Sequence, residues 1–205
     1  MPLQNKRLLF QNFLFDVHAE VYEPAEDSFL FAENLPQQET RSVLDMGTGC
    51  GILGVIAAKR AHRVLAVDIN PHAVQCAKHN ARLNKVNTKM AFLQSDLFSA
   101  LTPKAKFDFI LFNAPYVPSE DAETTFWLGR SWAGGPTGRY VIDRFISQAP
   151  HHLKRNGKIL LLQSTLSNVE ETRRLFSEQA LSTKTVAEKS LPFFETLVLV
   201  EAKPS

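Results

Sequence analysis

The sequence predicts an α/β protein built on a doubly wound, mostly parallel β-sheet. Short apolar or β-branched runs alternate with helical patterns along the chain, as in folds that join parallel strands through helices. Some runs are apolar throughout, such as residues 109–112, which fits strands that are covered on both faces. A glycine-rich turn follows the first run, at the kind of strand end where such sheets bind ligands.

The expected strands are short and rich in apolar and β-branched residues. They are residues 42–45, 63–68, 89–94, 107–113, 158–163 and 194–201. Helices are expected over residues 26–35, 52–60, 71 to about 83, 139–154 and 167 to about 179. Residues 1–16 carry a weaker pattern and are expected to form an N-terminal arm.

Local signals predict where several elements start or turn. Asn70 followed by Pro71 is typical of a helix start, because Asn caps the first turn and Pro fits the first helical position. Ser167 and Glu170 have the spacing of a capping box. The pair Asn156-Gly157 predicts a turn before the next strand.

Length and composition limit the class of protein. The chain of 205 residues is expected to form a single domain over residues 1–205. Its 44% of hydrophobic and 21% of charged residues exclude a disordered, collagen-like or coiled-coil protein. The net charge of +2 is too small to indicate a nucleic-acid binder.

The sequence also predicts a cytoplasmic protein without a membrane segment. Its apolar runs are far shorter than the roughly 20 residues of a spanning helix, and the N-terminus does not have the pattern of a signal peptide. Cys50 and Cys76 lack CxxC spacing and are expected to be reduced thiols. The six histidines show no metal-ligand spacing, so no metal site is expected.

The first expected strand ends in a glycine-rich loop that begins at Asp45. Gly47, Gly49 and Gly51 let the backbone turn sharply and approach a ligand closely. The loop would bind a dinucleotide pyrophosphate, bind S-adenosylmethionine, or form a tight turn without a ligand. Asp45 would repel a pyrophosphate but suits the ammonium and sulfonium groups of S-adenosylmethionine, which is therefore the favoured ligand.

Two later carboxylates support the same cofactor. Asp68 ends the next strand, where a carboxylate can accept hydrogen bonds from both ribose hydroxyls. Asp96 follows the third strand, where it can accept from the adenine amino group while Leu97 packs against the ring. The alternative for Asp96 is a solvated loop or helix-capping aspartate.

The fourth strand ends in Asn113-Ala114-Pro115-Tyr116. The Asn113 side-chain oxygen can accept a hydrogen bond from a planar NH₂ group, and Pro115 keeps Ala114 extended so that its carbonyl can accept from the same nitrogen. Tyr116 offers a flat face for an amide or a base. Two acceptors would stabilise the positive charge that grows on a nitrogen attacking a methyl group. Taken alone, the segment could also be a turn that ends the strand.

These motifs together resemble the N-methyltransferases that act on amides or exocyclic amines. Three further segments narrow the resemblance to the short, single-domain branch of the HemK-like release-factor glutamine methyltransferases: VYEPAEDSF (21–29), WAGGPTGR (132–139) and VIDRF (141–145). The resemblance covers residues 17–201. It implies a seven-stranded class I methyltransferase sheet with the last strand antiparallel, and methyl transfer to a glutamine amide in the Gly-Gly-Gln loop of a class I release factor.

The resemblance also implies roles for individual residues. The cofactor-binding residues would be Ser28 in an N-terminal lid, Asp45, Gly47, Gly49, Gly51, Asp68, Asp96, Leu97 and Asn113. The catalytic residues would be Asn113, Pro115 and Tyr116. The substrate-binding residues would be Asn113, Ala114, Tyr116, Trp132, Gly134 and Gly135.

Some features depart from the family pattern or leave two interpretations open. Ala114 stands where the family usually has a first Pro, which keeps the carbonyl but loosens the geometry. The branch often works with a small zinc-binding activator subunit paired along a sheet edge. Met90 and Phe92 would lie on that edge, or on a strand covered by its own helices. The glycine-rich residues 132–138 would clamp a substrate peptide, or would be a flexible connector.

Other functions stay open at this point. The Asn113 motif would also serve N6-adenine methylation of RNA or DNA, although the modest charge and the lack of a target-recognition domain oppose it. Lysine methylation is a further alternative. A cofactor-binding scaffold without catalysis is opposed by the intact Asn113, Pro115 and Tyr116.

Overall fold

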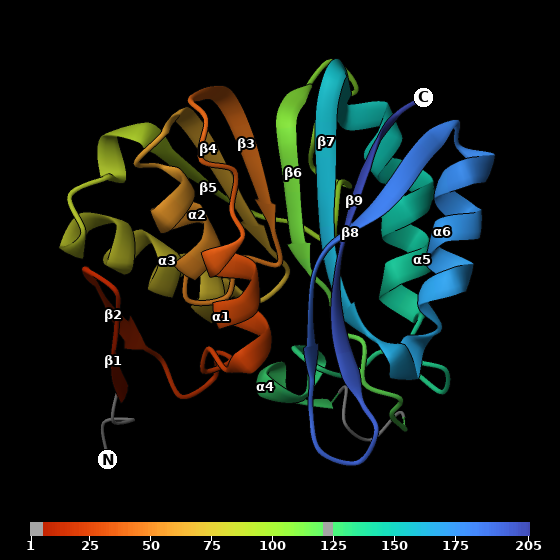
Figure 1. The fold of residues 1–205 in the computed structure, drawn as a ribbon. Coiled ribbons are helices and arrows are strands. Elements are labelled where there is room, and N and C mark those ends of the chain that lie inside the picture. Colours follow the sequence, from red (N-terminus) through yellow and green to blue (C-terminus); the bar gives the residue numbers. More distant parts are fainter. Residues whose placement is uncertain (1–5, 121–124) are drawn as a thin grey trace. The chain divides into compact units, whose positions relative to one another are not determined.

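A computed structural model describes residues 6–120 and 125–205 of the chain. The chain divides into two compact units, Met1–Ala100 and Leu101–Ser205, and each unit is described by itself (Figure 1). Across the described residues, every helix is too short or too polar to cross a membrane. The expected single domain over residues 1–205 stays a prediction.

The first unit alternates strands and helices after an N-terminal hairpin. Its elements are β1 (Lys6–Phe10), β2 (Phe13–Val17), α1 (Glu26–Glu33), β3 (Thr40–Met46), α2 (Ile52–Ala57), β4 (Ala61–Asp68), α3 (Pro71–Leu83), the short 3₁₀ helix η1 (Asn87–Lys89) and β5 (Met90–Gln94).

Strands β3, β4 and β5 of this unit run parallel in the order β5-β4-β3. Helix α2 packs against β3 and β4, and α3 packs against β4 and β5. Leu44 and Val67 are fully buried as a result. Burial of such a side chain stabilises the fold by about 1.5–3 kcal/mol.

The predicted start of α3 is confirmed. The Asn70 side-chain oxygen accepts a hydrogen bond from the His72 N–H at 2.9 Å, and Pro71 is the first helical residue. The helix ends at Leu83, as expected. Helices α1 and α2 start at the predicted residues but end two or three residues earlier than predicted.

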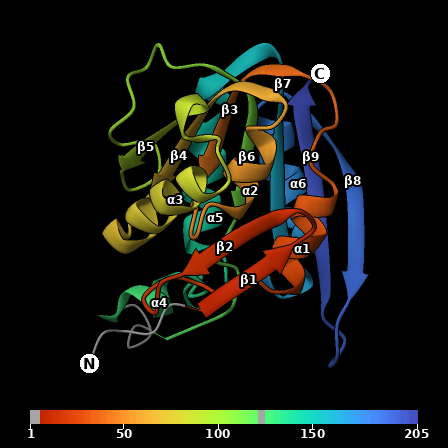
Figure 2. The same ribbon diagram turned by 90° about the vertical axis from the view of Figure 1, so that its left-hand side faces the viewer.

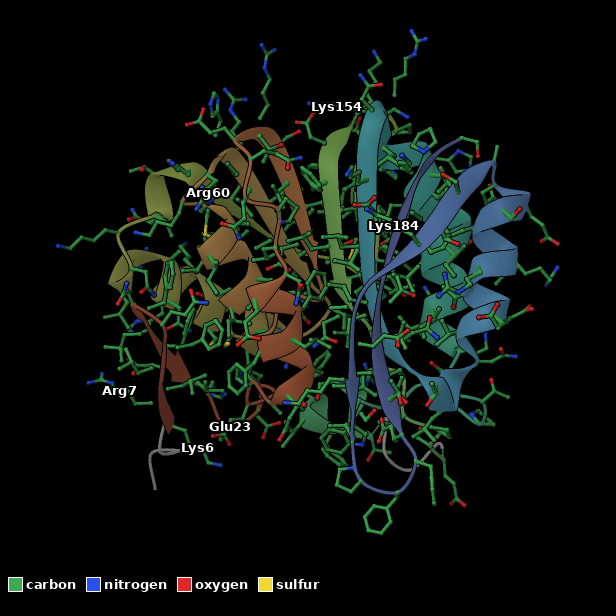
Figure 3. The ribbon with its side chains drawn as sticks, viewed as in Figure 1. Lys6, Arg7, Glu23, Arg60, Lys154 and Lys184 are labelled. Atoms are coloured by element: carbon green, nitrogen blue, oxygen red, sulfur yellow. The ribbon has the colours of Figure 1, made fainter. Side chains whose placement is uncertain are left out.

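The expected arm is an antiparallel hairpin over the residues that the structure describes, and residues 1–5 lie outside them. Figure 2 shows β1 and β2 as a separate two-stranded ribbon. Lys6 of β1 pairs with Glu23 at 2.5 Å (Figure 3), and Arg7 pairs with Asp16 of β2 at 2.7 Å. The hydrogen bond from Arg7 holds the pKa of the Asp16 carboxyl below its usual value.

The second unit contains the rest of the strands. Its elements are β6 (Phe107–Asn113), α4 (Trp127–Arg130), α5 (Tyr140–Gln148), η3 (Ala149–His152), β7 (Leu153–Ser164), η4 (Thr165–Ser167), α6 (Val169–Glu178), β8 (Leu181–Ser190) and β9 (Thr196–Pro204).

The strands of the second unit follow the order β6-β7-β9-β8. Strand β6 is parallel to β7, whereas β9 is antiparallel to both β7 and β8. Ile110, Leu161 and Leu199 are fully buried in the centre of this sheet. Strand content and order confirm the predicted fold class, a seven-stranded, mostly parallel α/β sheet with the last strand antiparallel.

The predicted helix over residues 139–154 is too long. Helix α5 ends at Gln148 because Pro150 cannot donate to a continuing α-helix, and β7 begins at Leu153. The turn predicted at Asn156-Gly157 lies inside β7, where the pairing with β6 is irregular. The register therefore shifts here, because Phe107 lies opposite Leu153 whereas Phe109 lies opposite Lys158.

Three other expectations also need correction. The cap of α6 is Asn168, whose side-chain oxygen accepts from the Glu171 N–H at 3.2 Å, and not Ser167, whose hydroxyl donates to the Ser164 carbonyl. The last strand begins at Thr196 instead of residue 194. Strand β8 was not predicted because its alternating polar residues resemble a loop more than a buried strand.

Candidate functional site

The glycine loop of the first unit joins β3 to α2. Gly51 has φ +88°, and a Cβ at this position would lie 3.0 Å from both Cα and Cβ of Ala77 on α3. Only glycine therefore fits there. Gly49 has φ +56°, and no atom lies within 4 Å of the position of its Cβ. The backbone at Gly49 is thus open to a ligand.

Asp45 is the next-to-last residue of β3, the strand that leads into this loop, and is fully buried. Its Oδ2 accepts hydrogen bonds from the Thr48 hydroxyl at 2.5 Å and from the Gly54 N–H at 2.9 Å. Its Oδ1 is buried and has no hydrogen-bond partner among the described residues. Burial raises the pKa of Asp45 to about 7, although both hydrogen bonds oppose the rise.

An unpaired, buried carboxylate oxygen costs free energy that a cationic group could offset. This residue set therefore fits the ammonium end of S-adenosylmethionine, and it does not fit a pyrophosphate. The observation agrees with the ligand that the sequence favours.

Asp68 is half-buried at the end of β4 and contacts the glycine loop directly. Its Oδ2 accepts from the Gly49 N–H at 2.9 Å, and its Oδ1 accepts from the Asn70 N–H at 2.9 Å. Burial raises the pKa of Asp68, and the backbone donors oppose the rise. Each carboxylate oxygen has a further lone pair with which it can accept from a ribose hydroxyl.

The turn after β5 lies beside Asp68, because the Ser95 N–H donates to the Asp68 carbonyl at 2.9 Å. Asp96 is exposed on this turn, and Leu97 is buried with a left-handed φ of +47°. The structure thus brings Asp45, Asp68 and the Asp96–Leu97 turn to the same end of three parallel strands. Ser28 is buried on α1, where its hydroxyl donates to Asp27 at 3.2 Å.

In the second unit, Asn113 is the last residue of β6 and lies opposite Leu162 of β7. The next residue, Ala114, is buried, and its N–H donates to the Leu162 carbonyl at 3.3 Å. Pro115 and Tyr116 are half-buried. The backbone of the motif is therefore held by β7 up to Ala114.

Residues 132–138 hold the other end of the motif. The Val117 N–H donates to the Trp132 carbonyl at 3.0 Å, and the Gly134 N–H donates to the Val117 carbonyl at 2.8 Å. Gly138 has φ +70°, and a Cβ there would lie 2.3 Å from the Tyr116 carbonyl oxygen. This glycine therefore allows the loop to lie directly against the motif.

The predicted peptide clamp of Trp132, Gly134 and Gly135 lies in the same loop. A Cβ at Gly134 would lie 2.6 Å from the Gly138 Cα, and Gly135 exchanges two hydrogen bonds of 3.0 Å with Ser119. These glycines let backbone groups of this chain itself lie close together. A role in gripping a substrate peptide stays a prediction.

Comparisons with known proteins agree with this geometry. The Methyltransferase small domain family matches residues 23–129. A Methanocaldococcus jannaschii protein, provisionally named a protein N5-glutamine methyltransferase, is 43% identical over 89% of this chain and 92% of its own length. The chain belongs to the HemK-like glutamine methyltransferases. The predicted family and enzyme class are therefore confirmed.

Two further relatives support the same family. Human methyltransferase HEMK2 is 32% identical over 80% of this chain and 80% of its own length. Among solved structures, the E. cuniculi Mtq2–Trm112 complex contains a chain that is 25% identical to this HemK-like protein, with a TM-score of 0.69 over 91% of this chain and 99% of that one.

Sequence reasoning missed one residue that holds the glycine loop of this HemK-like protein. Asn80 of α3 is fully buried, and its amide nitrogen donates to the Cys50 carbonyl at 2.8 Å and to the Asp16 carbonyl at 2.9 Å. Its oxygen accepts from the Asp16 N–H at 2.9 Å. Asn84, one turn later, binds the backbone of Leu14 in β2 in the same way. The available signal was an asparagine on the apolar face of a helix.

A second missed residue is Arg139, which follows Gly138 and is buried. Its guanidinium donates to the carbonyls of Ser167 and Asn168 and to Asp143. Its Nε has no hydrogen-bond partner in the described parts of the chain. Arg139 thereby fixes the end of the loop that supports Tyr116 to the segment that follows β7.

Proposed function

We propose that this protein methylates the side-chain amide of a glutamine in a class I release factor, within its Gly-Gly-Gln loop. The observation that carries the proposal is the placement of Asn113 and Ala114 at the end of β6, with the backbone held by Leu162 before the motif turns at Pro115. A side-chain oxygen and a backbone carbonyl in succession suit a planar amide, which offers two N–H groups.

The first unit supports S-adenosylmethionine as the methyl donor. Asp45 supplies a buried carboxylate for the cationic methionine end, Asp68 supplies acceptors for the ribose, and Gly49 leaves its backbone open. When bound, S-adenosylmethionine supplies a methyl group on a positively charged sulfur. Asp96, Leu97, Gly47, Gly51 and Ser28 keep the cofactor-binding roles that the resemblance implies.

The catalytic work assigned to this chain is orientation and charge stabilisation. Asn113 and the Ala114 carbonyl accept hydrogen bonds from the two amide hydrogens, and Tyr116 packs against the plane of the amide. Both acceptors bind more strongly as positive charge grows on the nitrogen. An acceptor of this kind contributes about 2.7–4 kcal/mol to the barrier reduction.

The names of the relatives support a protein substrate over a nucleic acid. The relative from M. jannaschii is named for N5-glutamine methylation, and the Mtq2–Trm112 complex is described as responsible for methylation of the termination factor eRF1. On this proposal the protein acts where translation ends, in the cytoplasm.

An activator subunit is part of the proposal. In the described residues, β5 has one paired neighbour, β4, so its other edge can take a further strand. Met90 is buried and Phe92 half-buried on that strand. A small partner that binds zinc would pair there. Copurification of the protein with such a subunit would support the pairing.

The test of function is methylation by the purified protein, with its activator where one copurifies. The protein is incubated with S-adenosylmethionine labelled in the methyl group and with either the release factor of its source organism or total RNA and DNA. We expect label on the release factor, at the glutamine of its Gly-Gly-Gln loop by mass spectrometry. A release factor with that glutamine replaced by alanine is the matched control.

Three outcomes would refute the proposal. Label found only on nucleic acid would favour adenine N6-methylation, and label on a lysine would favour lysine methylation. Methylation that persists with Asn113→Ala in place of the wild type would favour a scaffold whose activity comes from another protein.

A further inference from the structure

The turn between β8 and β9 carries the two most exposed aromatic side chains among the described residues. Phe193 is 96% exposed and Phe194 is fully exposed. The turn projects past the carboxyl end of β7 within its unit (Figure 1). Exposed apolar groups of this size on a projecting turn are unfavourable in water unless a partner covers them.

The backbone of these two residues is also unfavourable. Phe193 has φ +62° and Phe194 has φ +63°, in a turn closed by a 2.8 Å hydrogen bond from the Leu191 N–H to the Glu195 carbonyl. Two successive positive φ values are typical of hairpin turns that prefer Asn-Gly, and they are costly for Phe. Because both rings are exposed, packing within the chain does not offset that cost.

The hairpin holds this turn firmly. The Thr196 N–H donates to the Thr165 hydroxyl at 3.1 Å. Glu201 of β9 pairs with Lys158 of β7 at 3.0 Å and with Lys184 of β8 at 3.4 Å (Figure 3 labels Lys184). The exposed rings therefore lie at the end of the β8–β9 hairpin, which is bonded to β7.

The register places the turn beyond the carboxyl ends of β6 and β7, where the catalytic motif also lies. Asn113 of β6 lies opposite Leu162 of β7, and Ser164 at the end of β7 lies opposite Leu197 of β9. The chain of β9 before Leu197 leads outward to the turn. Phe193, Phe194 and Asn113 thus lie at the same end of the strands of the second unit.

We propose that Phe193 and Phe194 dock the protein that carries the target glutamine, by inserting into an apolar groove on its surface. The inference rests on the proposed function and names a further contact for the same substrate. The charged residues nearest in sequence are Glu188, Lys189 and Glu195, which together carry a net negative charge. That sign disfavours the phosphates of a nucleic acid or an anionic lipid.

The test replaces the pair with the sequence that the turn prefers, Phe193→Asn with Phe194→Gly. We expect a Tm equal to or above that of the wild type and unchanged affinity for S-adenosylmethionine. We expect kcat/KM for the whole release factor to fall roughly ten- to hundredfold, mainly through KM, because two buried rings are lost from the complex. Leu9→Asn removes an exposed apolar side chain of β1 in the other unit and should leave all three values unchanged.

Each other outcome overturns the proposal. A kcat/KM equal to that of the wild type, with the release factor methylated, refutes the docking role alone. Weaker cofactor binding or a lower Tm would show a structural role for the pair. If the wild type instead binds vesicles of phosphatidylglycerol and phosphatidylcholine, with this binding lost and kcat/KM kept in the variant, that result would assign the pair to a membrane. If self-association in sedimentation is lost while kcat/KM is kept, the pair would be assigned to contact with a second copy. A wild type that does not methylate the release factor would refute the proposed function and the docking role with it.

Discussion

Replacing Asp45 by asparagine should change the free energy of unfolding and the affinity for the cofactor in opposite directions. The pKa of the buried carboxyl is raised from an ordinary 3.8 to about 7. Between those values the folded chain keeps a proton that the unfolded chain releases, so wild-type stability falls as the pH rises through this range. At about 1.4 kcal/mol for each pH unit, the total loss at pH 8 is roughly 4 kcal/mol.

The Asp45→Asn variant cannot ionise and escapes this loss. Its amide oxygen can still accept from Thr48 and Gly54, while its NH₂ group takes the place of the unpaired oxygen at a cost of about 1–3 kcal/mol. The difference in unfolding free energy between variant and wild type should grow by roughly 2–3 kcal/mol in favour of the variant from pH 5 to pH 8. Urea unfolding at both pH values measures it.

Cofactor binding should change in the opposite direction. Because a cationic ligand needs the ionised carboxylate, wild-type affinity for S-adenosylmethionine should fall about tenfold for each pH unit below 7. The variant should bind roughly 30-fold more weakly or worse at pH 8, by calorimetry. Glu39→Gln, which removes an exposed carboxylate, is the control. A stability difference that is the same at pH 5 and pH 8, or wild-type affinity in the variant, would refute the reasoning.

Further predictions concern the two halves of the site. Asn113→Ala should abolish turnover but keep cofactor affinity within a few-fold, and Asp68→Ala should mainly weaken cofactor binding; calorimetry with undiminished affinity for the second variant would contradict this. Asn80→Ala should cost roughly 2–4 kcal/mol and weaken cofactor binding, because it leaves buried groups of the arm and of the glycine loop without hydrogen-bond partners. Asn84→Ala, whose side chain bonds the arm and the Asn80 carbonyl but not the glycine loop, should destabilise without that loss of affinity. Gly138→Ala should cost at least about 2 kcal/mol in urea unfolding, because φ is +70° and the new Cβ would overlap the Tyr116 carbonyl.

Elements with local signals could be predicted from the sequence. Strand β6 has its predicted bounds, and its apolar run over residues 109–112 ends at the polar Asn113. Helix α3 has its predicted start, since Asn70 and Pro71 both specify a first helical turn. Asp45 near the end of β3 and Asp68 at the end of β4 could be located for the same reason, because each follows an apolar run.

Features set by tertiary contacts could not be predicted. Strand β8 is stabilised by pairing with β9, which its own polar sequence does not reveal. The hydrogen bonds of Asn80 join residues far apart in the chain, to β2 and to the glycine loop. The sequence leaves open whether residues 132–138 clamp a peptide or form a flexible connector, and it does not show that neighbouring backbone fills the space beside Gly134 and Gly138. Local pattern shows that a glycine is required but not which group approaches it.

The paired asparagines of α3 have one more consequence. Asn80 and Asn84 bind the backbone of β2 as a neighbouring strand would, and Asn80 also holds the Cys50 carbonyl. We therefore expect the arm to detach from α3 and the glycine loop to loosen together. A bound ligand that rigidifies the loop should then protect the first strands from proteolysis, so cleavage of the N-terminal hairpin would report occupancy from outside the site.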